Sequence, residues 1–220
     1  MNTFLGPLIG IAGVFGILVL SETLRHKKIM KHAETLRKFV HILTGVFVAA
    51  WPFFMSMHAI QVLSVLMLLV VLVSKKLHVF RSIHGVGRQT FGEALFAIAI
   101  FMCATLAHSD WIYMAAVLHL SLADGLAATV GVRYLKRFSY TVFGQTKTVI
   151  GTATFFVISL LVTAAVMVFD TGSYEVMAQV ILLWLPVNAT ILENVAVYGT
   201  DNLLVPLFVV VLLNSLQGIS

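Results

Sequence analysis

Long apolar stretches separated by short polar connections run through the whole chain. A helix that crosses the roughly 30 Å hydrocarbon core of a membrane needs about 20 mainly apolar residues. About eight stretches approach this length, at residues 4–20, 39–56, 58–74, 93–108, 111–132, 148–169, 176–192 and 203–218. The pattern predicts an all-α fold, a polytopic transmembrane helical bundle of about seven to eight spans. It also predicts a single integral membrane domain over residues 1–220.

The composition supports a membrane protein. Of the 220 residues, 60% are hydrophobic and 10% are charged, whereas a typical soluble domain has about 25% charged residues. The apolar stretches leave no room for a separate soluble domain. The net charge of +5 is expected to attract anionic lipid headgroups and not nucleic acid. Cys103 is the single cysteine, which excludes an intramolecular disulfide and the zinc sites that are built from clustered cysteines.

The basic residues predict how the chain is oriented in the membrane. All 14 Lys and Arg residues fall in three connections, at residues 25–38, 75–88 and 133–147, and the positive-inside rule places these on the cytoplasmic side. The connection at residues 193–202 is then on the same side, and the N- and C-termini are predicted to be non-cytoplasmic. No basic residue precedes the first stretch, so we expect an anchor there and not a cleaved signal peptide.

Asp124 is unusual because it lies within the fifth apolar stretch. A carboxylate inside a span costs roughly 2.5–3.5 kcal/mol and normally faces a protein interior or a polar cavity. Asp124 precedes Arg133 by nine residues, or about 13 Å along a helix axis, which is within reach of a cavity open to the cytoplasm. Ser121, Ala128 and Gly131 recur at helical spacing and are expected to share its face. That face either packs closely against another helix or leaves room for a ligand.

Small, basic and hydroxyl residues lead into the sixth apolar stretch, namely Lys147, Thr148, Gly151 and Thr152. Free backbone N–H groups at a helix N-terminus, with a lysine and hydroxyls beside them, form a suitable phosphate site. Lys147 on its own is equally consistent with an anchor at the membrane interface. Together with Asp124, this segment offers a metal-binding carboxylate and a phosphate cradle at the two ends of one loop.

Two further polar groups lie at the starts of the second and fourth stretches. Lys38 and His41 are three residues apart, so both can lie on one helical turn. A hydrogen-bonded structural histidine is the alternative for His41. Glu93 opens the fourth stretch, where an acid complements the helix dipole. Support of a metal or of a substrate hydroxyl is the second interpretation of Glu93.

Acidic and amide side chains flank the last connection. Glu193 lies at the end of the seventh stretch, and Asp201 and Asn202 precede the eighth. Asp201 and Asn202 are suitable helix caps, and support of a metal or of the substrate is the second interpretation of Asn202. Carboxylates on the same side as Asp124 also suit Mg²⁺, which prefers oxygen ligands and usually retains phosphates and waters in its coordination sphere.

Four segments, taken in order, resemble the polyprenol kinase family, which includes dolichol kinase and phytol kinase and is distantly similar to CDP-diacylglycerol synthase. They are "RKFVHILTG", "GRQTFGEALF", "ADGLAATVGVRYLKR" followed by "GQTKTVIGT", and "ENVAVYGTDNLLVP". The resemblance covers residues 37–207, approximately. The loops and signatures of soluble nucleotide-binding and kinase folds are absent from the sequence.

The resemblance implies a membrane enzyme that transfers the γ-phosphate of CTP to an isoprenoid alcohol such as phytol, farnesol, geranylgeraniol or a dolichol, with Mg²⁺ as cofactor. The nucleotide-binding segment of the family corresponds here to Asp124, Ala127, Gly131, Lys136, Lys147, Thr148, Gly151 and Thr152. Its two lysines would bind phosphate oxygens. The chain departs from the family pattern at Leu135, where a second glycine is common, and at Ile150, where a glutamate is frequent. The choice among CTP, UTP and ATP stays open.

The predicted site supplies what phosphoryl transfer requires. This reaction depends on positioning and charge neutralisation more than on covalent help from the protein, and Mg²⁺ with nearby cations supplies both. In this hypothesis Asp124 and Asp201 hold the metal, and Glu193 or Asp124 orients or deprotonates the alcohol. Lys38 and His41 stabilise the transferring group. The active site faces the cytoplasm, and the apolar tail stays among the helices.

Two other functions remain as alternatives. A CTP-dependent cytidylyltransferase that acts on a lipid phosphate would release pyrophosphate and attach CMP to the lipid. A small membrane transporter would use Asp124 as a coupling or selectivity site. Transporters often consist of repeated halves, and the sequence shows no internal repeat, so the kinase is the favoured interpretation.

Overall fold

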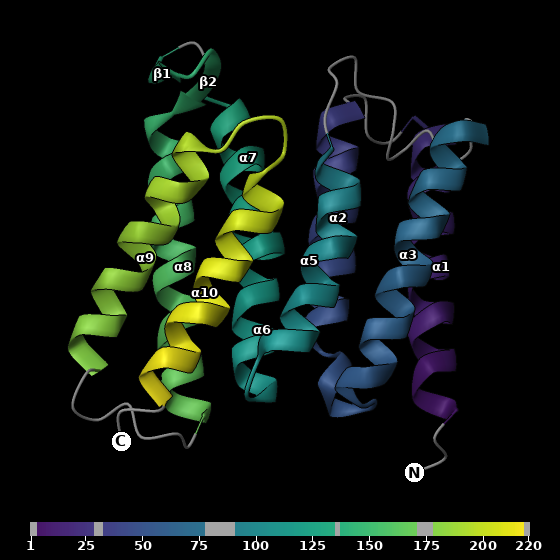
Figure 1. Ribbon diagram of the computed structural model, residues 1–220. Helices are drawn as coiled ribbons and strands as arrows, with labels where there is room; N and C mark the ends of the chain where they lie inside the picture. Colours follow the sequence, from purple (N-terminus) through teal and green to yellow (C-terminus); the bar gives the residue numbers. More distant parts are fainter. Residues whose placement is uncertain (1–3, 29–32, 78–90, 135–136, 171–177, 218–220) are drawn as a thin grey trace.

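Helices make up most of the computed structural model, which describes residues 4–28, 33–77, 91–134, 137–170 and 178–217 (Figure 1). The helices are α1 Leu5–His26, α2 Ala33–Ala49, α3 Met57–Leu77, α5 Gly92–Leu106, α6 Asp110–Leu118, α7 Asp124–Val132, α8 Val149–Phe169, α9 Ala178–Val195 and α10 Asp201–Gln217. A 3₁₀ turn, Trp51–Phe53 (η1), follows α2, and a π-helical turn, His119–Ala123 (η2), joins α6 to α7. The predicted helical bundle is thereby confirmed.

The predicted apolar stretches each overlap a helix or a run of consecutive helices. Among the described residues, four helical segments are long and apolar enough to cross a membrane, namely Leu5–His26, Met57–Leu77, Asp110–Val132 and Val149–Phe169. Shorter apolar helices occupy Gly92–Leu106, Ile181–Val195 and Asp201–Leu216. The number of spans and the side of the membrane on which the termini lie therefore stay predictions.

A β-hairpin marks one end of the bundle, which we call the hairpin end (Figure 1). It consists of strands β1 (Ser139–Val142) and β2 (Gln145–Thr148), paired antiparallel with Ser139 opposite Thr148. Phe143 and Gly144 both have positive φ, 47° and 77°, as expected for a two-residue type I′ turn. The all-α prediction lacked this hairpin, which places Lys147 on a strand directly before α8. α1 begins and α10 ends at the opposite end of the bundle (Figure 1).

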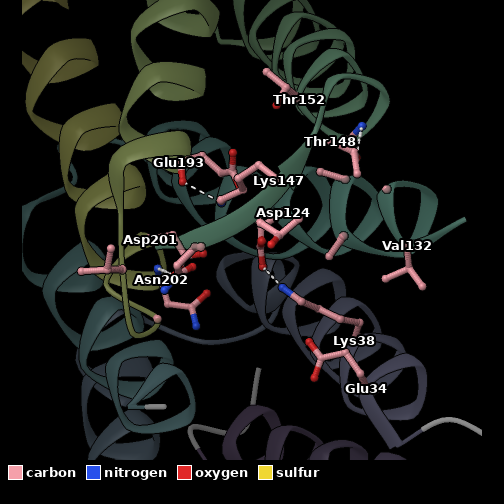
Figure 2. A pocket seen from close by; sticks show the side chains of 18 of the residues that line it. Glu34, Lys38, Asp124, Val132, Lys147, Thr148, Thr152, Glu193, Asp201 and Asn202 are labelled. Atoms are coloured by element: carbon pink, nitrogen blue, oxygen red, sulfur yellow. Dashed lines mark hydrogen bonds and ion pairs between the residues drawn. The ribbon is translucent and has the colours of Figure 1, made fainter. Parts of the chain in front are cut away.

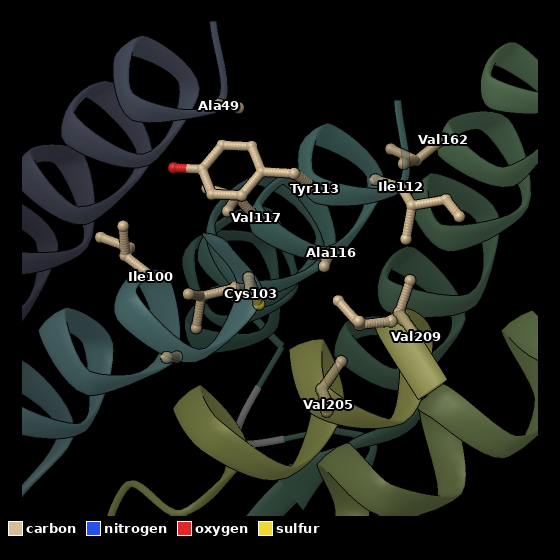
Figure 3. Packing of buried hydrophobic residues seen from close by; sticks show 14 of the residues in the cluster. Ala49, Ile100, Cys103, Ile112, Tyr113, Ala116, Val117, Val162, Val205 and Val209 are labelled. Carbon is tan, nitrogen blue, oxygen red and sulfur yellow. The ribbon is translucent and has the colours of Figure 1, made fainter. Parts of the chain in front are cut away.

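The short helix α6 lies at the centre of the bundle. Its fully buried residues are Ile112, Tyr113, Ala115, Ala116 and Val117. Burial on every side is expected of a helix that is apolar all round. Figure 3 shows Tyr113 and its neighbours packed among side chains that include Ile100 of α5 and Val205 of α10. The Tyr113 hydroxyl donates a hydrogen bond to the Val48 carbonyl at 3.3 Å, so α2 is fixed to the same centre that leads into η2 and Asp124.

Candidate active site

Three carboxylates from three helix ends meet near the hairpin end of the bundle (Figure 2). Asp124 begins α7, Glu193 lies near the end of α9, and Asp201 begins α10. One oxygen from each carboxylate lies within 4.8 Å of the other two. Asp124 and Glu193 are buried and Asp201 is half-buried. Three negative charges this close require cationic partners, because an unpaired buried charge is very costly.

Two lysines contact the carboxylates from different elements. Lys38 of α2 donates a hydrogen bond from Nζ to Asp124 Oδ2 at 2.6 Å. Lys147 of β2 contacts the Glu193 carboxylate and also donates to the Glu193 backbone carbonyl at 2.9 Å. Both ion pairs are visible in Figure 2. With all of these groups ionised, two positive charges face three negative ones, so the cluster favours one more cation.

His41 of α2 lies beside Asp124. Its Nε2 atom is 2.9 Å from the Leu120 carbonyl oxygen and 3.4 Å from Asp124 Oδ2. A carbonyl can only accept a hydrogen bond, so Nε2 is the donor and carries a proton. The His41 ring also packs against Phe96 of α5, with ring centroids 4.9 Å apart. These contacts fix the ring next to the carboxylate.

Close contacts at two glycines bring the charged half of α2 to Asp124. A Cβ atom built on Gly45 would overlap Ser121 of η2, and one built on Gly125 would overlap Ile42 of α2. Only glycine permits such an approach of two helices. Ser121 and Asp124 both face α2, as their spacing predicted, because Ser121 packs against Gly45 and Asp124 contacts Lys38. The π-helical turn that contains Ser121 leads directly into Asp124. Such turns are frequent at functional sites.

α7 and α8 also pack through glycines. A Cβ atom built on Gly131 would lie 3.4 Å from the Gly151 Cα atom, and the reverse distance is the same. Thr148 caps α8, because its Oγ1 accepts a hydrogen bond from the Gly151 N–H at 3.0 Å. Close packing is therefore one role of the small residues in α7. Ala127 and Ala128, from the same helix, line the space beside the carboxylates.

The carboxylates open onto a cavity of about 800 Å³, which we call the carboxylate cavity. Small-molecule sites typically measure about 300–1,000 Å³. The predicted site residues that line it are Lys38, Asp124, Ala127, Gly131, Lys147, Thr148, Gly151, Thr152, Glu193, Asp201 and Asn202. His41 and Glu93 are not part of its described lining and instead line a second cavity, treated below. Lys136 and Leu135 lie outside the described residues.

A relative with an assigned activity is similar along most of its length. The chain is 31% identical over 204 residues to the phytol kinase of Synechocystis sp., which covers 90% of this chain and 87% of that relative. The chain belongs to the polyprenol and phytol kinase family. The resemblance seen in the sequence is thereby confirmed, and the apolar helices of this family member indicate an integral membrane protein. No family model and no solved structure matches the chain.

The phosphate cradle predicted from the free N–H groups at the start of α8 is partly filled by the protein itself. The Val149 N–H donates to the Phe138 carbonyl at 2.9 Å, and the Gly151 N–H donates to Thr148 Oγ1. Both N–H groups would otherwise be available to an anion, because the first turn of a helix has no internal acceptors for them. These two N–H groups are therefore not free to bind an anion at this end of the cavity, whereas Lys147 also lines it.

The hairpin of this kinase family member is joined to α8 and α9 through Thr152, which was predicted, and through Tyr140 and Asn194, which were not. The Tyr140 hydroxyl contacts Thr152 Oγ1 and Asn194 Oδ1, and Thr152 Oγ1 donates to Asn194 Oδ1 at 3.4 Å. The sequence contains a signal for this arrangement. In "SYTVFGQTKT", β-branched residues lie on both sides of a Gly-containing turn, which indicates a hairpin.

Arg37 extends the predicted set, and Asn202, which was predicted, has an unpaired atom. Arg37, which is buried, pairs with Glu34 one turn earlier at 2.7 Å, and it lines the carboxylate cavity. Asn202 donates from Nδ2 to the Gly92 carbonyl at 2.9 Å. Its buried Oδ1 atom has no hydrogen-bond partner among the described residues. Because buried polar atoms are nearly always paired, an unpaired oxygen on a cavity wall points to a bound ligand, water or ion.

Proposed function

We propose that this family member is a membrane-embedded kinase that transfers the γ-phosphate of CTP to the hydroxyl of an isoprenoid alcohol in a Mg²⁺-dependent reaction. The observation that carries the proposal is the meeting of three carboxylates and two lysines on one wall of the carboxylate cavity. The acceptor class is taken from the relative, which is a phytol kinase. Phytol, farnesol, geranylgeraniol and longer polyprenols are the candidate acceptors.

The side chains present fit a magnesium ion. Mg²⁺ prefers oxygen ligands and is usually bound through one or two carboxylates together with substrate phosphates. Asp124 and Asp201 would hold it, with Glu193 close by and the unpaired Oδ1 of Asn202 on the same wall. When bound, the ion would neutralise negative charge on the triphosphate.

The lysines would bind the phosphate oxygens of the nucleotide. Lys38 and Lys147 already neutralise Asp124 and Glu193, and each could exchange part of that contact for a phosphate oxygen once a cation joins the carboxylates. Lys147 lies on β2, so the hairpin would close one side of the nucleotide site. Lys136 stays in the proposal as a further phosphate ligand.

The carboxylates would also position the acceptor. The alcohol oxygen attacks the γ-phosphorus while the bond from that phosphorus to the β–γ bridging oxygen breaks, which yields a prenyl phosphate and CDP. The hydroxyl proton passes to Asp124 or Glu193 and then to water. His41 would lie beside the reacting groups, with Nε2 3.4 Å from Asp124 Oδ2 and bonded to the Leu120 carbonyl. Positioning and charge neutralisation supply most of the catalysis in such reactions.

The experiment is a phosphotransfer assay with the full chain in lipid nanodiscs, supplied with labelled CTP, UTP or ATP and with phytol, farnesol or geranylgeraniol. We expect Asp124→Asn to lower kcat by about 10²–10³-fold, as removal of a group that acts on the transition state does. Asp110→Asn is the matched control, because Asp110 is exposed and begins the same run of helices at the other end. EDTA should abolish activity and excess Mg²⁺ restore it.

The products separate the alternatives. Prenyl phosphate and CDP support the kinase, whereas a CMP-linked lipid and pyrophosphate would identify a cytidylyltransferase. Ion or solute flux in liposomes without nucleotide would identify a transporter. Equal turnover of wild type and Asp124→Asn would remove the carboxylate cluster from the mechanism.

A further inference from the structure

A second cavity, of about 350 Å³, lies between α1, α2, α3 and α5, and we call it the apolar groove. Its walls are formed mainly by aliphatic and aromatic side chains, such as Val14, Leu63, Met67 and Phe96. Its volume lies within the range of about 300–1,000 Å³ that is usual for ligand sites. A space with such walls suits a hydrocarbon and not a nucleotide.

The apolar groove meets the carboxylate cavity at α2. Arg37 lines both spaces. His41 lines the groove, while its Nε2 atom lies 3.4 Å from the carboxylate of Asp124, which lines the other cavity. A molecule with its hydroxyl at Asp124 and its tail beyond His41 would therefore occupy both spaces.

Two buried polar atoms on the groove wall lack protein partners. Thr44 Oγ1 and Trp51 Nε1 have no hydrogen-bond partner among the described residues, and both residues line the groove. Buried donors normally find acceptors in a packed protein core. Both atoms are covered by protein and add no polar surface to the groove at these two positions.

The groove extends along α2 away from the hairpin end. His41 and Trp51 are ten residues apart along α2 and η1, or about 15 Å at the helical rise. On the facing helix α1, Leu18, Val14 and Ile11 line the groove at increasing distance from the hairpin end. Successive turns of α1 therefore mark successive depths, each about 5.4 Å apart.

We propose that the apolar groove binds the isoprenoid tail of the acceptor alcohol, with the hydroxyl end beside His41 and the far end towards Trp51, so that its depth selects chain length. This inference rests on the proposed function, because it names the second half of the same substrate site. An acyl chain of a bilayer lipid is the competing occupant. It would fill the groove without any relation to the length of the alcohol.

The test compares alcohols that differ by one isoprene unit, geraniol, farnesol and geranylgeraniol, in the same phosphotransfer assay. Val14→Trp would obstruct the groove midway. We expect it to lower kcat/KM for geranylgeraniol at least about tenfold, a typical discrimination by an apolar pocket. Geraniol should change by less than about twofold, because a short tail would end before this point. Ile11→Trp lies deeper and should affect geranylgeraniol alone.

Val19→Trp is the matched control, because Val19 is on α1, is 46% exposed and is not part of the described groove lining. It should leave all three alcohols unchanged. An equal loss for all three alcohols in Val14→Trp, or no loss for any, would overturn the inference and favour a lipid occupant.

A second measurement uses the unaltered protein, so it does not depend on a variant that folds. A diazirine-bearing geranylgeraniol analogue is photo-crosslinked in nanodiscs, and the labelled peptides are identified by mass spectrometry. Labels on α1, α2 and α3 residues of the groove, displaced by unlabelled geranylgeraniol, support the inference. Labels confined to α8 and α9 contradict it. Groove labelling in a protein that phosphorylates no alcohol would reject the proposed kinase but keep the tail site.

Discussion

The carboxylate cavity and the apolar groove lie on either side of α2 and have opposite chemistry. Carboxylates, lysines and hydroxyls from α7, the hairpin, α9 and α10 line the first, and aliphatic side chains from α1, α3 and α5 line the second. Lys38 faces the carboxylate cavity, and Thr44 faces the groove. One amphipathic helix thus separates a site suited to a water-soluble donor from a site suited to a lipid acceptor.

His41 lies between the carboxylate cavity and the apolar groove and contacts residues of both. It contacts Asp124 through one ring nitrogen and packs its ring against Phe96 on the groove side. A reaction between a phosphate and a lipid hydroxyl must occur at the point where the two spaces meet. In the proposed function, the reacting atoms would therefore lie near His41 and Asp124.

The largest effect is expected from Lys38→Met, which removes a cation from the carboxylate cavity. This change leaves Asp124 buried without its closest cation, and loss of one partner from a buried ion pair typically costs about 3–5 kcal/mol. We expect a comparable fall in the free energy of unfolding, followed by thermal unfolding in detergent micelles, together with loss of phosphotransfer. Lys76→Met, at an exposed position on α3, should change stability by less than about 0.5 kcal/mol.

The double variant Lys38→Met/Asp124→Asn separates stability from catalysis. Removing the unpaired charge should restore much of the stability, because the pair is then replaced as a unit. Activity should stay absent, since the proposed metal ligand is gone. A Lys38→Met protein as stable as wild type would show that the ion pair with Asp124 does not form.

A smaller effect is expected from a change at the contact between Gly125 and Ile42, where α7 packs against α2. Gly125→Ala places a methyl group against Ile42, and overpacking of this kind typically costs about 1–3 kcal/mol. The same displacement moves α2 away from Asp124, so kcat should fall as well. Gly16→Ala is the control, because a Cβ at Gly16 has no described atom within 4 Å. Recovery of stability in Gly125→Ala/Ile42→Ala would assign the loss to this contact, and failure to recover would refute the assignment.

The helices and the grouping of polar residues were predictable because membrane-spanning stretches have a strong hydrophobic signal. Asp124, Glu193 and Asp201 lie at stretch ends or within about two turns of the basic connections, so alternating spans bring them to one end of the bundle. The structure describes Asp124 beside Lys38, a pairing that needs the Gly45 and Gly125 contacts. Those contacts depend on which helices are neighbours, and composition alone does not specify that.

Other features left no clear signal in the sequence. The π-helical turn before Asp124 shifts the register by one residue, which helical periodicity does not resolve. The apolar groove was not located, because α1 and α3 are apolar on nearly every side and the same residue types face lipid and cavity. Glu93, predicted as a helix cap or as support for the polar site, lines the groove. His41 lines the groove and also lies 3.4 Å from Asp124 in the polar site to which it was assigned. The expectation that the substrate tail stays among the helices did not indicate which helices.

The smallest effect is expected from Thr44→Val, a substitution in the wall of the apolar groove. The substitution keeps the shape of the side chain and removes the unpaired hydroxyl on the groove wall. An unsatisfied buried polar atom costs about 1–3 kcal/mol, so the ligand-free variant should be slightly more stable than wild type, by about 1 kcal/mol. Thr163→Val is the control, because Thr163 Oγ1 is buried but donates to the Ser159 carbonyl at 2.8 Å. Thr163→Val should therefore give no gain in stability. An equal change in stability in both variants would mean that the Thr44 hydroxyl is not unpaired. KM for geranylgeraniol in Thr44→Val should stay equal or fall, whereas a marked rise would show that the hydroxyl contacts the substrate.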